Sequence, residues 1–193
     1  AVSAVADDGG EAGRLDSKQL YSAGMKAFSA GNYTRAAQHF STFLDRYETE
    51  PLMSNVLPRV YYGLGCARYN MREYNAALPL LSNYLVRAPL GKFRKDALFR
   101  IANVHQILNE YEASRASYRR LLTEFPDVPE KDDIAFQIAV SYLAQEMYTN
   151  ALPLLEKIAR YTDTPDIADA CEAWELRCYY LTEQYDAALD ALR

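Results

Sequence analysis

The chain has 193 residues, half of them hydrophobic, with a formal net charge of -5 and a pI near 5.1. The apolar content is sufficient to bury a core, which excludes a disordered chain. The acidic balance argues against nucleic-acid binding, because such binding neutralises phosphates with Lys and Arg. No apolar run approaches the ~20 residues that span a bilayer, so we expect no membrane span.

The N-terminal segment, residues 1–16, is expected to be a flexible tail or the remnant of a signal sequence. Ala4-Val5-Ala6 before Asp7 has the small-x-small form of a signal-peptidase site. This motif favours a periplasmic or otherwise exported protein. The alternative is a tail that is simply rich in small residues, and with it a cytoplasmic protein.

The stretch GNYTRAAQHF, from Gly31 to Phe40, returns four times further along the chain. The later copies read REYNAALPLL, NEYEASRASY, EMYTNALPLL and EQYDAALDAL. We call the tyrosine of each copy its anchoring tyrosine: Tyr33, Tyr74, Tyr111, Tyr148 and Tyr185. Their spacings are 41, 37, 37 and 37 residues, a period that is typical of solenoid and array architectures.

Each repeat predicts two antiparallel helices that meet at a turn. In the first repeat an apolar stripe of Leu20, Ala23, Gly24 and Ala27 has helical spacing. After each anchoring tyrosine, a small residue three positions on and a larger apolar one four later predict the second helix. The small residues, such as Gly24, allow the two axes to approach closely.

Five repeat units are predicted within a repeat domain at 17–193. Asp16 with Gln19 resembles a capping box at the first helix, and Gly31 closes that helix. Prolines fall between later units, where no helix needs to continue. The approximate bounds of the units are 17–50, 54–90, 92–127, 130–164 and 166–193.

Helix pairs with a small residue late in the first helix, a tyrosine at the turn and an alanine three residues later resemble tetratricopeptide repeats. The resemblance covers roughly residues 17–193. It implies an all-α, right-handed superhelical solenoid of about five hairpins, whose first helices line a concave groove. The period of 37 is longer than the usual 34. In this long spacing the chain is similar to bacterial envelope proteins such as the Tol-Pal-associated periplasmic coordinator and the outer-membrane assembly lipoprotein.

The resemblance implies which residues face the groove. Twelve, eight and five residues before the anchoring tyrosines, the side chains are mostly aromatic or apolar, with two amides, both in the third unit. We predict a groove for a partner segment; the alternative is that these rings pack between neighbouring first helices as core. The candidates are Tyr21, Met25, Phe28, Tyr62, Tyr69, Phe99, Asn103, Gln106 and Phe136.

No enzyme is predicted, and no metal or cofactor. His39 and His105 lie in different repeats without a ligand spacing that completes a metal site. No G-x-S-x-G elbow, phosphate loop or H-E-x-x-H motif occurs. Cys66, Cys171 and Cys178 are interpreted as small residues in or near the core.

The last repeat departs from the pattern. Its stripe holds Glu172 and Glu175, so we expect its first helix to rotate and to present Ala170, Ala173, Trp174 and Leu181 instead. An apolar edge around Trp174 and Leu189 is then a possible interface. Either the chain is part of a longer array, which we favour, or this edge meets a partner or a second copy.

The predicted function is therefore a non-catalytic scaffold or adaptor that binds a protein or peptide in an aromatic groove, in the bacterial envelope. The alternative is a structural or oligomerising spacer in which the rings are core and association runs through the C-terminal edge. The identity of the partner does not follow from the sequence, because repeats of this kind share their core residues and differ at the groove.

Overall fold

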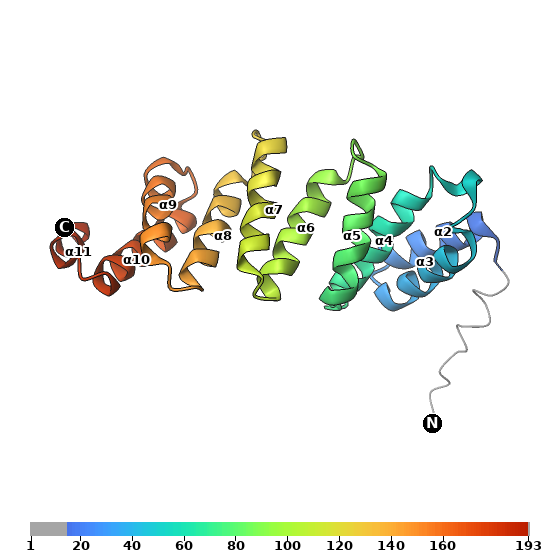
Figure 1. Cartoon of the computed structure of the whole chain (residues 1–193), viewed down its shortest axis with the longest axis horizontal. Coiled ribbons are helices and arrows are strands. Elements are labelled where there is room, and N and C mark those ends of the chain that lie inside the picture. The colour runs from blue at the N-terminus through green and yellow to red at the C-terminus, as the bar shows by residue number, and fades with distance from the viewer. Residues whose placement is uncertain (1–14, 193) are drawn as a thin grey trace, which may run out of the picture. The chain divides into compact units, whose positions relative to one another are not determined.

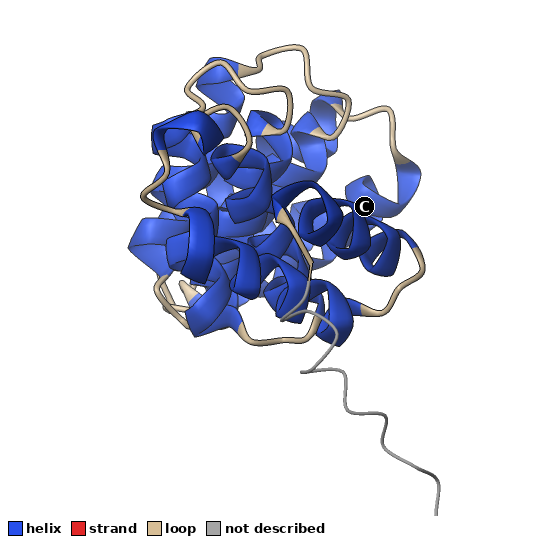
Figure 2. Ribbon diagram, turned by 90° about the vertical axis from the view of Figure 1, so that its right-hand side faces the viewer, coloured by secondary structure: helices blue, strands red, loops and turns tan. Residues whose placement is uncertain are grey.

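A computed structural model describes residues 15–192. The signal-peptidase motif at Ala4-Val5-Ala6 lies outside the described residues. Within the described range ten α-helices and one 3-10 turn follow one another, with no strand (Figures 1 and 2). The all-α prediction is confirmed. The elements are α2 (Ser17–Ser29), α3 (Tyr33–Tyr47), η1 (Pro51–Met53), α4 (Leu57–Asn70), α5 (Tyr74–Arg87), α6 (Arg94–Ile107), α7 (Tyr111–Glu124), α8 (Lys131–Leu143), α9 (Tyr148–Tyr161), α10 (Pro165–Leu181) and α11 (Tyr185–Ala191).

The helices follow the predicted pairing along the chain. We number the consecutive pairs hairpins 1 to 5, from α2–α3 to α10–α11, and each second helix begins at an anchoring tyrosine. The described residues form two compact units that divide between Val104 and His105, within α6. We call them the N-terminal unit and the C-terminal unit and describe each by itself.

The turn inside every hairpin contains a residue in the left-handed conformation, two positions before the anchoring tyrosine. It is Gly31 in hairpin 1, with φ of 75°, but a residue with a side chain in the other four: Arg72, Asn109, Glu146 and Glu183, with φ between 58° and 62°. The following amide donates to a carbonyl five residues back, as in Met147 to Tyr142 at 3.0 Å. This is the Schellman pattern, which satisfies carbonyls at the end of the first helix.

The left-handed turn predicts a stabilising substitution. Glu146→Gly is expected to raise the free energy of unfolding by about 0.5–1 kcal/mol, because glycine adopts φ of 58° without the steric cost borne by glutamate. Gly31→Ala is the reverse change at the matching position and should lower it by about 1 kcal/mol. Thermal and denaturant unfolding followed by circular dichroism measure both, and a destabilised Glu146→Gly would contradict the expectation.

The core of the N-terminal unit is built around the fully buried ring of Phe40 on α3. This ring lies between two glycines, one on α2 and one on α4. A Cβ placed on Gly24 would stand 2.6 Å from the ring, and one on Gly63 would stand 2.8 Å from it. Gly65 has the same relation to Leu81 of α5, at 2.9 Å. The small residues thus allow close approach of the helices, as the sequence predicts.

Two further positions, fourteen and seven residues before each anchoring tyrosine, form the face by which a first helix packs. In hairpins 2 to 5 their side chains are at most 1% exposed: Val60 and Ala67, Ala97 and Val104, Ile134 and Ser141, Cys171 and Cys178. In hairpin 1 the same positions are the exposed Gln19 and Lys26. The first helix of hairpin 1 therefore has polar, exposed side chains at the two positions that are buried in the other hairpins.

Helix α10 does not rotate as predicted from its two glutamates. Cys171 and Cys178 are fully buried, whereas Ala173 is exposed and Leu181 is 42% exposed. The prediction was wrong because it took Glu175 for a residue that the helix must turn away from the core. The helix instead keeps the register of the other hairpins and leaves Glu175 half-buried.

Glu175 therefore lowers the stability of the folded protein, and a substitution can restore that stability. Its Oε1 is buried without a hydrogen-bond partner among the described residues, and burial, then Glu156 and Glu172, raises the pKa of its carboxyl. Because the folded-state pKa of this carboxyl lies above its unfolded-state pKa, stability falls as pH rises from the unfolded value to the folded one, and it stays at the lower level above that.

We expect Glu175→Leu to stabilise the protein by about 1 kcal/mol at pH 7, since the matching residues of hairpins 2 to 4 are Leu64, Ile101 and Ile138. The gain should shrink toward pH 4, where the wild-type carboxyl is protonated. Urea unfolding at both pH values measures the difference. An equal gain at pH 4 and pH 7 would show that the charge is not its cause.

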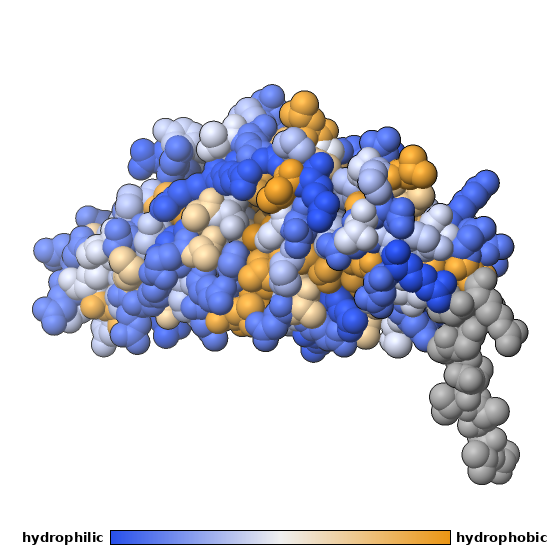
Figure 3. All heavy atoms as spheres, turned by 45° about the vertical axis from the view of Figure 1, so that its right-hand side comes forward, coloured by the Kyte–Doolittle hydropathy of each residue, from blue (hydrophilic) through white to orange (hydrophobic). Residues whose placement is uncertain are grey.

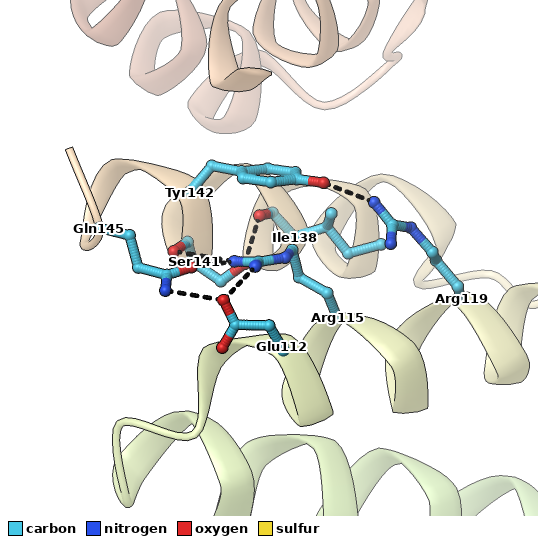
Figure 4. Close-up of polar contacts among 7 residues, drawn as sticks. All are labelled: Glu112, Arg115, Arg119, Ile138, Ser141, Tyr142 and Gln145. Atoms are coloured by element: carbon cyan, nitrogen blue, oxygen red, sulfur yellow. Dashed lines mark hydrogen bonds and ion pairs between the residues drawn. The ribbon is translucent and has the colours of Figure 1, made fainter. Parts of the chain in front are cut away.

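The C-terminal unit contains a polar network where the other hairpins use apolar contacts (Figure 4). Arg115 of α7 is 5% exposed and donates to the backbone oxygen of Ser141 at 3.3 Å, to Gln145 Oε1 at 2.5 Å and to Glu112 Oε1 at 3.1 Å. Its guanidinium stands 4.2 Å from the ring centroid of Tyr142. These contacts join α7 to α8, so the network links two successive hairpins.

Candidate functional site

The predicted groove residues of α2 lie at the edge of the N-terminal core. Tyr21 is half-buried, with its ring centroid 6.3 Å from that of Phe40, and Phe28 makes an edge contact with Tyr33 at 5.4 Å. Met25 is 38% exposed. Packing on one side holds the two rings in place, while Met25 offers an apolar side chain to solvent.

Tyr62 of α4 is engaged with its neighbours. Its ring stacks on Phe93 at 4.3 Å with an interplanar angle of 5°, and its hydroxyl donates to Asp96 Oδ2 at 2.7 Å. Burial, then the nearby Cys66 and Asp96, raises the pKa of the Tyr62 hydroxyl, which stays protonated. These contacts agree with the alternative interpretation of Tyr62, in which its ring packs within the protein and does not face a partner.

Tyr69, also on α4, contacts Arg100 and Asn103 of α6. The guanidinium of Arg100 stands 5.0 Å from the Tyr69 ring centroid and donates to Asp96 at 2.5 Å. Phe99 and Asn103 are half-buried, and Asn103 hydrogen-bonds to Tyr69. Within the N-terminal unit, Asp96 and Arg100 therefore connect Tyr62 with Tyr69 and Asn103, and these candidates and Phe99 form a layer of half-buried side chains on α4 and α6.

The remaining two groove candidates lie in the C-terminal unit. Gln106 donates from Nε2 to Gln137 Oε1 at 3.0 Å and accepts from Ser114 Oγ at 3.3 Å. Phe136 is half-buried and packs against the core of α8, α9 and α10. Both amide oxygen and amide nitrogen of Gln106 thus already have partners inside the unit.

The predicted C-terminal edge forms an apolar face on α10 and α11. Trp174 is half-buried with Arg177 over its ring at 5.1 Å, and Leu189 is 57% exposed. Beside Leu189 lie Tyr180, Tyr185 and Leu192, which are 65%, 54% and 67% exposed and line the same shallow cavity of about 640 Å³.

The equivalent face of hairpin 4 is covered by the helix that follows it. Leu189 and Leu192 stand four and seven residues after their anchoring tyrosine. In hairpin 4 the matching residues, Leu152 and Leu155, are 8% and 0% exposed because they pack in one cluster with Cys171 and Cys178 of α10. The face that carries Leu189 is thus equivalent to one that another helix covers.

Residues 15–192 contain neither a metal-binding cluster nor a membrane-spanning helix. No group of three or more His, Cys, Asp or Glu side chains there is arranged to hold a metal ion. None of the helices in that range has the length and hydrophobicity to cross a membrane. Cys66 is buried, and burial raises the pKa of its thiol to about 11, so it is a weak nucleophile.

The face of the molecule drawn in Figure 3 is mostly polar. Hydrophilic residues cover most of the face drawn in Figure 3, and hydrophobic residues reach the surface in patches among them. Scattered exposed apolar side chains are ordinary in a folded protein.

A known family model matches part of the chain. Residues 62–129 match the family model described as tetratricopeptide repeat. No curated protein matches the chain in sequence. The family match covers most of hairpin 2 and all of hairpin 3, and the all-α fold of the described residues is similar to that of solved tetratricopeptide-repeat solenoids.

Several solved structures share the fold. The crystal structure of MamA protein is similar with a TM-score of 0.67 and 14% identity, over 95% of this chain and 89% of that one. A tetratricopeptide repeat protein from Parabacteroides merdae has a TM-score of 0.64 and 16% identity, over 91% and 63% of the two chains. Repeats of a putative kinesin light chain from Podospora anserina give 0.63 and 14%, over 91% and 90%. Proteins with this fold generally mediate protein–protein interaction.

Proposed function

We propose that the protein is a non-catalytic scaffold that binds a segment of a partner protein on the first-helix face of its N-terminal unit. The observation that supports this most is the layer of half-buried side chains that includes Tyr69, Phe99 and Asn103, together with exposed Met25 on α2. Rings fixed by packing on one side lose little entropy when a partner covers the other side.

The chemistry of this face defines the partner. Aromatic and thioether groups favour an apolar anchor side chain, and the Asn103 amide lies among them. A short extended or helical segment with apolar residues on one side fits this description. The bacterial envelope is the setting that we propose for it.

The test compares two matched variants in a capture experiment from a lysate of the source organism. Met25 and Met147 are both 38% exposed, but Met147 lies in the turn of hairpin 4. A charge at Met25 should therefore repel an apolar anchor, while the same charge at Met147 should not. Quantitative mass spectrometry of the retained proteins measures the effect.

We expect at least one protein whose retention falls ~10-fold or more in Met25→Glu and is unchanged in Met147→Glu, as the loss of a central apolar contact implies. Identical retention profiles for both variants would refute binding on this face. Circular dichroism of both variants controls for folding.

A second candidate function is self-association through the apolar face of α10 and α11. It is favoured by Leu189 and Leu192, which are exposed where Leu152 and Leu155 are covered. A second copy would meet this face with its own α10–α11 face, because the outer face of α2 carries Gln19 and Lys26 instead of buried apolar residues. Light scattering across a concentration series tests it: the mass should double, and Leu189→Glu should abolish the doubling.

A further inference from the structure

A cavity of about 550 Å³ lies in the C-terminal unit among α7, α8 and α9, and we call it the α8 cleft. Ala135, Ile138 and Ile158 contribute apolar side chains to its lining. Arg119, Lys131 and Lys157 line it as well, one from each of the three helices. The cleft thus combines an apolar lining with three cations.

The cleft is open because one position of the repeat carries a small residue. Ala135 stands thirteen residues before its anchoring tyrosine, where hairpins 1 to 3 have Leu20, Tyr61 and Leu98. Those three side chains are 0%, 5% and 1% exposed. A large side chain therefore fills this position in each earlier hairpin, and alanine leaves it vacant in hairpin 4.

Hairpin 2 shows which chemical group fills the position that Ala135 holds in hairpin 4. There Tyr61 occupies the position, with the Arg87 guanidinium 4.9 Å from its ring centroid and its hydroxyl donating to Glu48. The residue that matches Arg87 beside the α8 cleft is Tyr161, which is 71% exposed. An aromatic ring is thus the group that the chain itself places in the equivalent position.

The three cations together distinguish the α8 cleft from hairpin 2, whereas hairpin 3 has two of them, as Arg94 and Arg120, around Leu98. The residues that match Arg119, Lys131 and Lys157 around Tyr61 are the uncharged Ser41, Leu57 and Asn83. One carboxylate, Asp132, also lines the cleft and accepts a hydrogen bond from Thr162 at 2.8 Å.

The charge of these cations is little neutralised by the protein. Arg119 donates to the hydroxyl of Tyr142 at 2.7 Å, and neither lysine has an ion-pair partner within residues 15–192. The local charge is therefore positive in a chain whose net charge is -5. An anionic ligand should therefore bind in this cleft in preference to other parts of the acidic protein surface.

We propose that the α8 cleft binds an acidic segment of a partner protein that inserts one aromatic side chain beside Ala135. The ring would cover the apolar lining, and flanking carboxylates would pair with Lys131, Lys157 and Arg119. This site is separate from the first-helix face of the N-terminal unit, so either can fail without the other.

The test is a titration with the peptide acetyl-Asp-Glu-Tyr-Glu-Asp-amide, followed by methyl NMR of alanine and isoleucine. Two control peptides replace its tyrosine by alanine or its four acids by lysine. The protein variants are Ala135→Tyr, which copies the ring of hairpin 2, Ala135→Ser as its matched control, and the double variant Lys131→Glu, Lys157→Glu.

We expect saturable shifts of the Ala135, Ile138 and Ile158 methyl signals with the acidic tyrosine peptide. Affinity should fall at least ~10-fold in Ala135→Tyr and in the double lysine variant, and stay within about threefold in Ala135→Ser. Absence of saturable shifts in the wild type, or equal binding of the peptide that lacks the ring, would overturn the proposal. Should Ala135→Tyr not fold, the double lysine variant and the control peptides decide.

Discussion

Replacing Phe40 with alanine is expected to lower the free energy of unfolding by about 3–5 kcal/mol, because the ring is fully buried and contacts two neighbouring helices. The loss comprises the transfer energy of the ring and the cavity that it leaves. Since Gly24 and Gly63 both face the ring, the cavity would open between hairpins 1 and 2. Urea unfolding of the purified variant measures this value.

A double-mutant cycle tests whether the close contact between the Phe40 ring and Gly63 contributes to the stability of this core. Gly63→Ala alone should cost about 1–3 kcal/mol, because its Cβ would stand 2.8 Å from the ring. Combined with Phe40→Leu it should cost less than the sum of the two single changes. Strict additivity, or a loss below about 1.5 kcal/mol for Phe40→Ala, would contradict this account of the N-terminal core.

Replacing Arg115 with alanine should cost about 2–4 kcal/mol, since it removes a buried side chain and leaves Ser141 and Gln145 without their donor. The ring of Tyr142 also loses its cation–π contact. Denaturant unfolding of the variant gives the size of the loss. Arg119→Ala is the matched control on the same helix: this arginine is exposed and contacts only the edge of the network, so its loss should be small.

Replacing both Arg115 and Ser141 with apolar residues should destabilise the protein less than Arg115→Ala does. In the next hairpin the positions of Arg115 and Ser141 are held by Leu152 and Cys178, which lie in one buried cluster. We expect Arg115→Leu with Ser141→Cys to unfold within about 1 kcal/mol of the wild type or to be more stable, because apolar contact replaces a network that requires desolvation. A double variant as unstable as Arg115→Ala would show that the polar network is needed for more than filling the interface.

The sequence predicted the elements of the fold well because repetition strengthens a weak signal. One turn with a tyrosine is uninformative, but five in register placed the start of every second helix. The capping box is also confirmed: Gln19 N–H donates to Asp16 at 2.8 Å and Asp16 N–H donates to Gln19 at 3.0 Å. The right-handed superhelix and the individual unit bounds stay predictions.

The candidate site was less predictable, since position along a helix does not tell which contacts a side chain makes. The engagement of Tyr62 with Phe93 depends on the loop before α6, which has no periodic pattern. The rotation expected for α10 failed because two buried cysteines outweigh one half-buried glutamate. Apolar positions fourteen residues before the anchoring tyrosines would have predicted the register.

The α8 cleft corresponds to a difference between the repeats that is visible in the sequence. Leu20, Tyr61 and Leu98 align with Ala135, and a single small residue in such a series indicates either a repacked core or an opening. Only the structure distinguishes the two, because it shows that Ala135 lines a cavity.

The most direct measurement of partner binding uses the four methionines of the chain: Met25, Met53, Met71 and Met147. Labelled methionine methyl groups give one signal each, and the protein recovered by capture is titrated into the labelled chain. We predict that the signal of Met25 shifts with saturation while that of Met147 stays in place. Saturable binding that moves Met147 and leaves Met25 unchanged would contradict the proposed interface on the first helices.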